Sequence, residues 1–444
     1  MLPLVWKGLT ISDFAVIGLI ESSTPFLGSI LTLCTEQYLT RFYYTWNDGD
    51  RDTNVSKTLT IGIIALGGIG LILLAMLGGL YPFIDPNDFL YFLLGLLHII
   101  FFSSLTFPNS LFRISNNTNG YMALTLTMFF TRLLLNYVFT ITMGWGLYGY
   151  VLSNTINSFV FFVIVYVYLL SQYSMKTDRG FFKEALSFSL PYIPTNLMSN
   201  IAMLADRLVL SVYVGKFEAG LLTLGQKVAS ISGSLSQAIK LGYVPYISEF
   251  VAKPKHSMSR FNLYRMVFVA PISIASFFLI LFGADLLQLI GIDVEGVNKY
   301  LYLFLLIVYL TANNLFFAPG LYLSKRSDKM WLPNIVQLTI RFVLYFFLVP
   351  TYLLEGVIIA SVVASLVSFI HNYYLSEKYF KMNADLVGIA IQFLPFIVTI
   401  AMVLFGVEIF NLGIFQRVLA MGIYLLILGS YLFLRYEKNH TQPV

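Results

Sequence analysis

Long apolar stretches recur along almost the whole chain and limit what it can fold into. A bilayer core is about 30 Å thick, so a helix that crosses it needs roughly 20 mostly apolar residues. No stretch alternates polar and apolar residues as a membrane-spanning strand would, so helices must satisfy the backbone hydrogen bonds. The sequence therefore predicts an all-α, polytopic membrane helix bundle with about thirteen transmembrane helices. We place them at Ile11–Leu39, Thr58–Leu80, Phe89–Phe112, Tyr121–Met143, Gly146–Leu170, Leu186–Val214, Gly220–Pro245, Met266–Leu287, Tyr300–Leu323, Leu332–Val349, Leu354–Tyr374, Val387–Phe410 and Ile414–Leu434.

The composition excludes several classes of protein. Apolar and aromatic residues make up 58% of the 444 residues and charged residues only 11%, whereas a soluble domain has roughly 25% charged residues. The net charge of +5 is too small to suggest nucleic-acid binding. A single cysteine, Cys34, excludes a disulfide framework. The four histidines are too far apart to suggest a metal site, and no cofactor is predicted.

The distribution of lysine and arginine predicts an orientation. If the loop with Arg41, Arg51 and Lys57 is cytoplasmic, most of the 27 basic residues fall on that side, as the positive-inside rule requires. The C-terminus is then cytoplasmic and the amino end lies outside. The opposite side holds only Lys7, Lys216, Lys299 and Arg417.

Polar and charged residues inside the predicted spans are the candidate functional residues. A charge at the bilayer centre costs at least about 2.5 kcal/mol, so each one needs a partner or an aqueous cavity. The sixth and seventh spans carry polar stripes at helical spacing, and the first carries Glu21. An aqueous cleft explains these stripes, and so does close helix packing by small residues. For Arg132, Lys240 and Arg341, snorkelling toward a membrane surface is an equal alternative.

Several short segments resemble one family of membrane proteins. They are Phe188–Pro194 with the sequence FSLPYIP, Ala205–Leu210 with ADRLVL, Val214–Gly220 with VGKFEAG, and Lys227–Ile231 with KVASI. Together with the hydropathy pattern, they resemble the Wzx-type polysaccharide flippases of the multidrug/oligosaccharidyl-lipid/polysaccharide exporter superfamily.

The resemblance implies two pseudo-repeated six-helix lobes around a central cationic cavity, followed by two additional helices. It divides the chain into an N-terminal lobe of five spans at residues 1–175, a C-terminal lobe of six spans at 176–380, and two further spans with a cytoplasmic tail at 381–444. The segment Leu2–Phe14 looks like the exit of a first helix, so we expect that the family's first helix is missing.

The resemblance also implies the function. Such proteins are not enzymes, and they move undecaprenyl-pyrophosphate-linked oligosaccharides across the bacterial cytoplasmic (inner) membrane for O-antigen, capsular or exopolysaccharide synthesis. Polysaccharide polymerases and chain-length regulators are the expected partners, with a proton or sodium ion for coupling. The nearest alternative is a multidrug exporter of the same superfamily, and a polysaccharide polymerase or ligase is a more distant one.

The residues expected to act in this function come from several spans. We assign the pyrophosphate to the basic residues and the sugar to the amides and the serine, and we assign ion coupling to the acids. The basic residues are Arg207, Lys227, Arg132, Lys240 and Arg341, the sugar-binding residues are Asn196, Asn200, Gln226 and Ser230, and the acids are Glu21 and Asp206.

Overall fold

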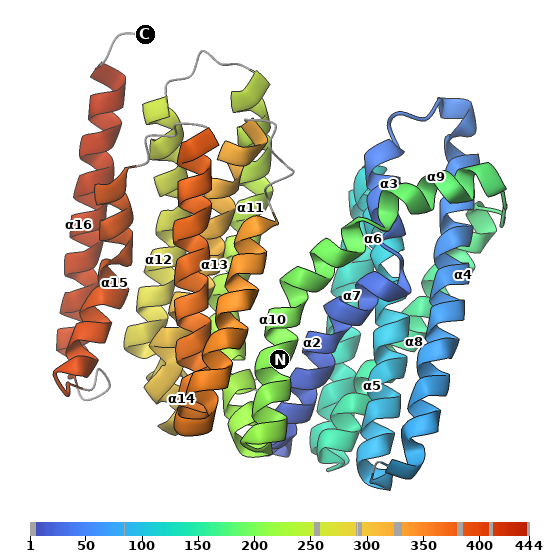
Figure 1. The fold of residues 1–444 in the computed structure, drawn as a ribbon, viewed down its shortest axis with the longest axis horizontal. Helices are drawn as coiled ribbons and strands as arrows, with labels where there is room; N and C mark the ends of the chain where they lie inside the picture. The colour runs from blue at the N-terminus through green and yellow to red at the C-terminus, as the bar shows by residue number, and fades with distance from the viewer. Residues whose placement is uncertain are drawn as a thin grey trace. The chain divides into compact units, whose positions relative to one another are not determined.

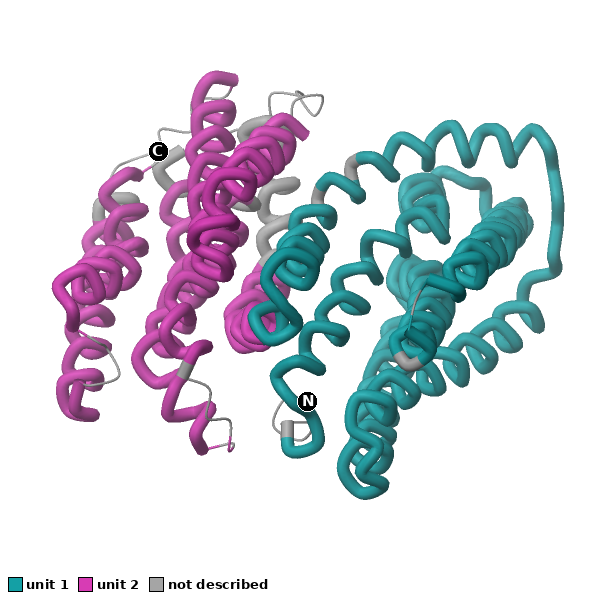
Figure 2. Tube along the Cα trace, turned by 60° about the horizontal axis from the view of Figure 1, so that its bottom comes forward, with its two compact units in different colours: residues 1–220 teal, residues 221–444 magenta. Residues whose placement is uncertain are grey.

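Helices joined by short turns make up the structure, which is a computed structural model. It describes residues 6–83, 85–252, 258–289, 291, 295–323, 331–379, 385–407 and 412–441. No strand occurs among these residues, and the predicted all-α fold is confirmed. The chain divides into two compact units, residues 1–220 and 221–444, which are coloured separately in Figure 2.

Unit 1 is built around helices α2, α5, α8 and α10. Helix α2 packs against α4, α5 and α10, and α5 packs against α8. The elements of unit 1 in chain order are η1 Trp6–Gly8, α2 Asp13–Leu31, α3 Thr35–Phe42, α4 Asp48–Leu80, η2 Tyr81–Phe83, α5 Pro86–Ser104, α6 Thr106–Ile114, α7 Thr118–Asn136, the π-helix η3 Tyr137–Thr142, α8 Gly146–Gln172, α9 Arg179–Ser189 and α10 Tyr192–Tyr213 (Figure 1).

Unit 2 contains most of the long helix α11 and the remaining helices. Helix α13 packs against α12 and α14, and α12 also packs against α15 and α16. The bounds are α11 Lys216–Ala252, α12 Met258–Leu289, α13 Glu295–Leu323, α14 Leu332–Tyr379, α15 Leu386–Leu404 and α16 Ile414–Thr441. Helix α14 is broken at Leu353, where φ is 47° and ψ is −121°, and this break separates two of the predicted spans.

Among the described residues, nine helices are long and apolar enough to cross a membrane. One of the nine is the whole of α14, in which the sequence predicts two spans. The total of thirteen transmembrane helices stays a prediction. The lobe division at residue 175 also stays a prediction, although α10 packs on α2 inside unit 1, whereas the sequence analysis assigned it to the second lobe.

The first predicted span is two helices rather than one. Helix α2 ends at Leu31, and Leu33 and Cys34 adopt left-handed backbone conformations with φ of 48° and 52° before α3 begins. Such conformations are costly for residues other than glycine, so tertiary contacts must hold them. Beyond the break, the Tyr38 hydroxyl donates to Glu184 Oε1 at 3.0 Å, which ties α3 to α9.

The sixth predicted span is also divided. Helix α9 ends at Ser189 and α10 begins at Tyr192, with Pro191 at its N-cap. Proline is well tolerated at the start of a helix because the first amides have no partner within it. The two prolines of this segment, Pro191 and Pro194, therefore mark a helix boundary rather than a kink within one long helix.

The last two helices pack on α12 through buried polar contacts. The Gln392 amide of α15 donates to the Met266 carbonyl at 2.9 Å, and Ser273 Oγ donates to the Gln392 carbonyl at 2.7 Å. Ser273 Oγ also lies 2.5 Å from the Tyr424 hydroxyl of α16. Polar groups away from water need such partners, so these bonds fix α15 and α16 on unit 2.

Glycines permit very close backbone approaches in both units. A Cβ atom added at Gly149 would lie 2.5 Å from the Phe139 carbonyl oxygen, and one added at Gly356 would lie 2.6 Å from the Leu348 carbonyl oxygen. By contrast, nothing lies within 4 Å of a Cβ atom added at Gly68 of α4.

We expect Gly149→Ala to destabilise the protein by about 1–3 kcal/mol, because the backbone of η3 would have to move. Gly68→Ala is the matched control and should be neutral or stabilising, since alanine is a better helix former than glycine. Melting temperatures of the purified variants in detergent measure the difference. Equal melting temperatures for both variants would contradict the close approach at Gly149.

Candidate functional site

Three helices bring charged side chains together inside unit 1. Glu21 lies on α2, Arg132 on α7 and Arg207 on α10, and Arg207 is only 3% exposed. Arg207 interacts electrostatically with Glu21 and with its neighbour Asp206, which is also buried. His98 of α5 is in electrostatic range of both Arg132 and Glu21. The structure thus brings together four predicted site residues, Glu21, Arg132, Asp206 and Arg207, within one unit.

Helix α8 supplies the hydrogen-bond partners of this cluster. The Arg132 Nε donates to Asn154 Oδ1 at 2.6 Å, and the Tyr150 hydroxyl donates to Glu21 Oε1 at 3.3 Å. His98 Nδ1 lies 2.8 Å from Ser158 Oγ. A charged group buried without such contacts would be strongly destabilising, so α8 holds both signs of charge in place.

The sequence predicts this helix as the fifth span, but its polar face was missed. Its buried polar residues Ser153, Asn154, Asn157 and Ser158 recur at helical spacing, as clearly as the stripes of the first, sixth and seventh spans. The Ser153 hydroxyl donates to Asn136 Oδ1 at 2.7 Å. The same periodicity test, applied to the fifth predicted span, would have found them.

A small cavity of about 10 Å³ opens between these side chains. Glu21, Arg132, His98, Tyr150 and Asn154 line it together with apolar side chains. A single water molecule needs about 10–15 Å³, so a pyrophosphate group does not fit here in this conformation. The cluster is therefore a closed polar interior that must rearrange before it can hold a large anion.

The two predicted sugar-binding asparagines of α10 form contacts within unit 1. The Asn196 amide donates to Cys34 Sγ at 3.3 Å, beside the left-handed residues between α2 and α3. The Asn200 amide donates to the Asn196 carbonyl at 2.8 Å. Both side chains are half-buried, and Asn196 supports the break that ends α2.

The predicted site residues of the seventh span belong to unit 2. Gln226 and Lys227 are half-buried on α11, while Ser230 is exposed and its hydroxyl donates to the Lys227 carbonyl at 2.6 Å. The side chain of Lys240 lies outside the described part of the structure. Arg341 of α14 is 4% exposed, so it lies inside unit 2 rather than at a surface, which excludes snorkelling in this conformation.

Arg132 and Arg341 occupy corresponding places in two similar helix pairs. Arg132 precedes Asn136 by one helical turn, and Asn136 accepts the Ser153 hydroxyl. Arg341 likewise precedes Tyr345 by one turn, and the Tyr345 hydroxyl lies 3.5 Å from Ser361 Oγ. In both pairs a glycine at the start of the second helix, Gly149 or Gly356, lies against a carbonyl at the end of the first. The two helix pairs thus share a spacing of residues and a type of contact.

Unit 2 buries two further arginines that were not predicted to lie in the membrane interior. Arg265 was counted with a cytoplasmic loop, but it lies within α12, is fully buried and is in electrostatic range of Tyr309. Arg417 was assigned to the outer side, but it is only 6% exposed and forms an ion pair with Asp285.

Among the described residues, no group of three or more His, Cys, Asp and Glu side chains is arranged to hold a metal ion.

We expect Asn154→Ala to destabilise unit 1 by about 1–3 kcal/mol, because Arg132 and Asn136 both lose the amide oxygen that they share. Val160→Ala, at an exposed position of the same helix, should change stability by no more than about 0.5 kcal/mol. Thermal unfolding of the two variants in detergent compares them. A smaller effect at Asn154 than at Val160 would contradict the role assigned to α8.

Comparisons with known proteins agree with the fold. A family model described as polysaccharide biosynthesis protein matches residues 9–290, which is more than half of the chain. Among curated proteins, no significant sequence match is found.

Solved structures with a similar fold include membrane transporters. An inward-facing multidrug resistance MATE family transporter of the MOP superfamily superposes with a TM-score of 0.66 at 17% identity, covering 85% of this chain and 92% of that one. The lipid II flippase MurJ in an inward closed conformation superposes with a TM-score of 0.67 at 13% identity, covering 97% and 95%. The MATE multidrug transporter DinF-BH gives a TM-score of 0.61 at 18% identity, covering 84% and 89%. The predicted resemblance to this superfamily is confirmed, and the chain belongs to the polysaccharide biosynthesis protein family.

Proposed function

We propose that this protein is a flippase that moves undecaprenyl-pyrophosphate-linked oligosaccharide units across the bacterial cytoplasmic membrane by alternating access. The product would serve O-antigen, capsular or exopolysaccharide synthesis. Family membership supports a role in polysaccharide synthesis, and the shared fold with a lipid flippase supports transport of a lipid-linked substrate. The proposal assigns no catalytic step to any residue.

The observation that carries this proposal is positive charge buried among long apolar helices. Arg207 is almost completely buried in α10, and Arg132 reaches the same polar interior from α7. Guanidinium groups bind phosphate oxygens through charge-assisted hydrogen bonds, often two at a time. Buried arginines therefore offer an anionic head group a replacement for its water of hydration.

The acids beside these arginines suggest how the site is kept closed without substrate. Glu21 and Asp206 balance Arg207 electrostatically in the present conformation, and the neighbouring cavity is too small for pyrophosphate. In our proposal the head group replaces the carboxylates as the partner of Arg207 when the unit opens. We assign Lys227, Lys240 and Arg341, the predicted basic residues of unit 2, to phosphate binding as well.

The sugar and the lipid tail place different demands on the protein. The half-buried amides of Asn196, Asn200 and Gln226, with the exposed Ser230 hydroxyl, offer hydrogen bonds to sugar hydroxyls. The polyprenyl tail is apolar and can stay in the bilayer while the head group moves. We place the C-terminus and the predicted basic loops in the cytoplasm, and we expect a polysaccharide polymerase and a chain-length regulator as partners.

We expect Arg207→Ala and Lys227→Ala each to lower glycan export about tenfold or more, because a phosphate loses a charge-assisted hydrogen bond. Accumulation of glycan-linked lipid in a deletion strain carrying each variant measures export, and immunoblots of membranes verify the protein level. Arg41→Ala, at an exposed position in α3, is the control and should export normally.

Normal export by both variants would remove the proposed pyrophosphate site. The same strains test the alternative of a multidrug exporter, which the half-buried carboxylate of Glu21 favours because it would attract organic cations. If the wild-type protein lowers the accumulation of ethidium and leaves glycan export unchanged, the alternative replaces our proposal.

Ion coupling is the part of the proposal that depends on Glu21. The carboxylate accepts a hydrogen bond from Tyr150 and balances Arg207. Binding of a proton or a sodium ion to Glu21 would weaken its hold on Arg207, which links ion entry to release of the guanidinium for substrate.

We therefore expect Glu21→Gln, which keeps an oxygen for Tyr150 but cannot take up a proton, to export at a rate that no longer responds to the ion gradient. Transport in proteoliposomes with and without a proton or sodium gradient measures this response. Asp50→Asn, at an exposed position of α4, should respond as the wild type does. An unchanged response of Glu21→Gln would assign coupling to another residue.

A further inference from the structure

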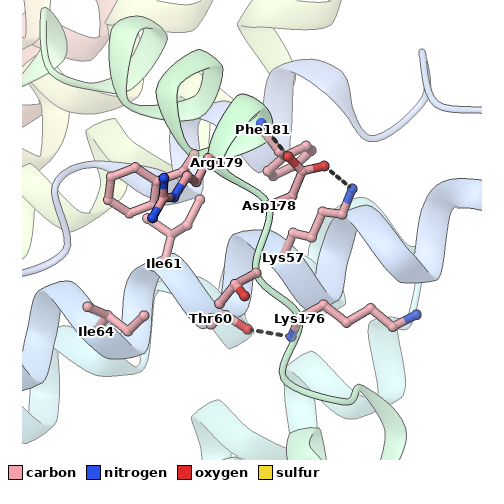
Figure 3. Close-up of a pocket in the computed structure, with 10 residues that line it drawn as sticks. Lys57, Thr60, Ile61, Ile64, Lys176, Asp178, Arg179 and Phe181 are labelled. Carbon is pink, nitrogen blue, oxygen red and sulfur yellow. Dashed lines mark hydrogen bonds and ion pairs between the residues drawn. The ribbon is translucent and has the colours of Figure 1, made fainter.

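A second cavity lies at the surface of unit 1, whereas the first lies in its polar interior. It has a volume of about 240 Å³ and lies between helix α4, the loop that follows α8, and helix α9 (Figure 3). Three basic residues line it, Lys57, Lys176 and Arg179, together with the single acid Asp178. The lining therefore carries an excess of positive charge.

The charged part of this cavity is built by the start of α9. Asp178 is the N-cap of the helix and accepts hydrogen bonds from the amides of Gly180 and Phe181. Its other carboxylate oxygen lies 3.0 Å from Lys57 Nζ. The Lys57 ammonium, followed by the two amides, lowers the pKa of Asp178 below its ordinary value. The loop is thus held in a fixed conformation with Lys57 at its edge.

Arg179 is placed differently from Lys57. Its side chain is exposed, and within the described residues its guanidinium makes no hydrogen bond or ion pair. In Figure 3 it lies on the side of Ile61 and Ile64, while Lys57 and Asp178 lie on the other side of the cavity. An anion between Lys57 and Arg179 would have a positive charge on each side.

The apolar part of the cavity continues into a strip of exposed apolar side chains on α4. Ile64 lines the cavity and is 53% exposed. Leu71 and Ile72, two turns further along the same face, are 69% and 60% exposed. Helix α4 is long and apolar enough to cross a membrane, and in a bilayer this strip would face lipid chains.

Helix α9 has the features of a helix at a membrane surface. It lies across the end of unit 1 where α3 and the start of α4 are found (Figure 1). Its exposed residues include the apolar Phe182 beside the basic Arg179 and Lys183. This combination is typical of helices that lie in the plane of the membrane interface and attract anionic lipids.

From this arrangement we infer that the cavity binds the phosphate of an anionic glycerophospholipid between Lys57 and Arg179, with an acyl chain along Ile64 and α4. The cavity is smaller than the roughly 300–1,000 Å³ typical of sites for larger ligands, so a glycerophosphate fits and an oligosaccharide does not. The inference does not depend on which substrate the protein transports. Bound lipid would fasten α9 to α4 at the membrane surface.

Native mass spectrometry of the full chain in detergent, titrated with dioleoyl-phosphatidylglycerol, tests this inference. Arg179→Ala should raise the dissociation constant of the tightest lipid at least fivefold. Lys183→Ala removes the same charge from an exposed position of the same helix that does not line the cavity, and it should change the constant less than twofold. Equal effects of the two variants would mean general electrostatic attraction and would overturn the site.

Two more variants separate the parts of the site. Asp178→Asn keeps a good N-cap and releases Lys57, so it should tighten lipid binding at least threefold. Ile64→Ser should weaken binding of the phospholipid and leave binding of glycerol 3-phosphate unchanged. Weaker lipid binding by Asp178→Asn would overturn the proposed position of the phosphate.

Competing ligands distinguish the phosphate of a membrane lipid from a free phosphate ion. Dioleoyl-phosphatidylcholine should bind at least fivefold more weakly than the phosphatidylglycerol, because it carries no net negative charge. Inorganic phosphate at millimolar concentration should not displace the bound lipid. Complete displacement by inorganic phosphate would assign the cavity to a free anion instead of a membrane lipid.

Discussion

Charge buried away from water is the constraint on which unit 1 depends. Arg207 and Asp206 are almost completely buried, and the cost of removing them from water is offset only if other groups solvate them. Glu21 on α2 balances Arg207. Tyr150 and Asn154 of α8 in turn hold Glu21 and Arg132. The polar interior therefore sets how α2, α7, α8 and α10 are packed, while the apolar surfaces of these helices leave many other packings open.

The sequence predicts the class of fold because the requirement is chemical and local. Every segment that must cross lipid has to be apolar over about 20 residues and helical, and that pattern is visible without any knowledge of tertiary contacts. The same reasoning fails at Leu33 and Cys34, where two residues that favour right-handed conformations adopt positive φ. Asn196 contacts Cys34 there from 162 positions away, and no pattern in the sequence connects the two.

The candidate site was predicted in part for a related reason. Charges such as Glu21, Arg132 and Arg207 are conspicuous in apolar helices, and hydropathy alone identifies them. Arg265 escaped notice because it lies near the predicted end of a span, where a charge is expected to reach water, yet the structure buries it completely. The polar face of α8 carries no charge, and it became meaningful only when Asn154 was found beside Arg132.

The helix pairs that carry Arg132 and Arg341 share one arrangement although few of their residues are identical. The shared features are an arginine, a polar contact one turn later, and a glycine against a carbonyl. The polar contact joins an asparagine to a serine in one pair and a tyrosine to a serine in the other. Backbone geometry and the type of interaction are thus repeated, whereas the side chains that supply the interaction differ.

The break between α2 and α3 has a consequence for movement. Helix α3 is fastened to α9 by the bond between Tyr38 and Glu184 and by the contact of the Tyr38 and Phe181 rings, and α2 carries Glu21 on the other side of the break. Because Leu33 and Cys34 already leave the helical path, α2 can tilt about them as about a pivot without breaking its own backbone ladder. A rearrangement at Glu21 would then tilt α2 while α3 and α9 keep their positions.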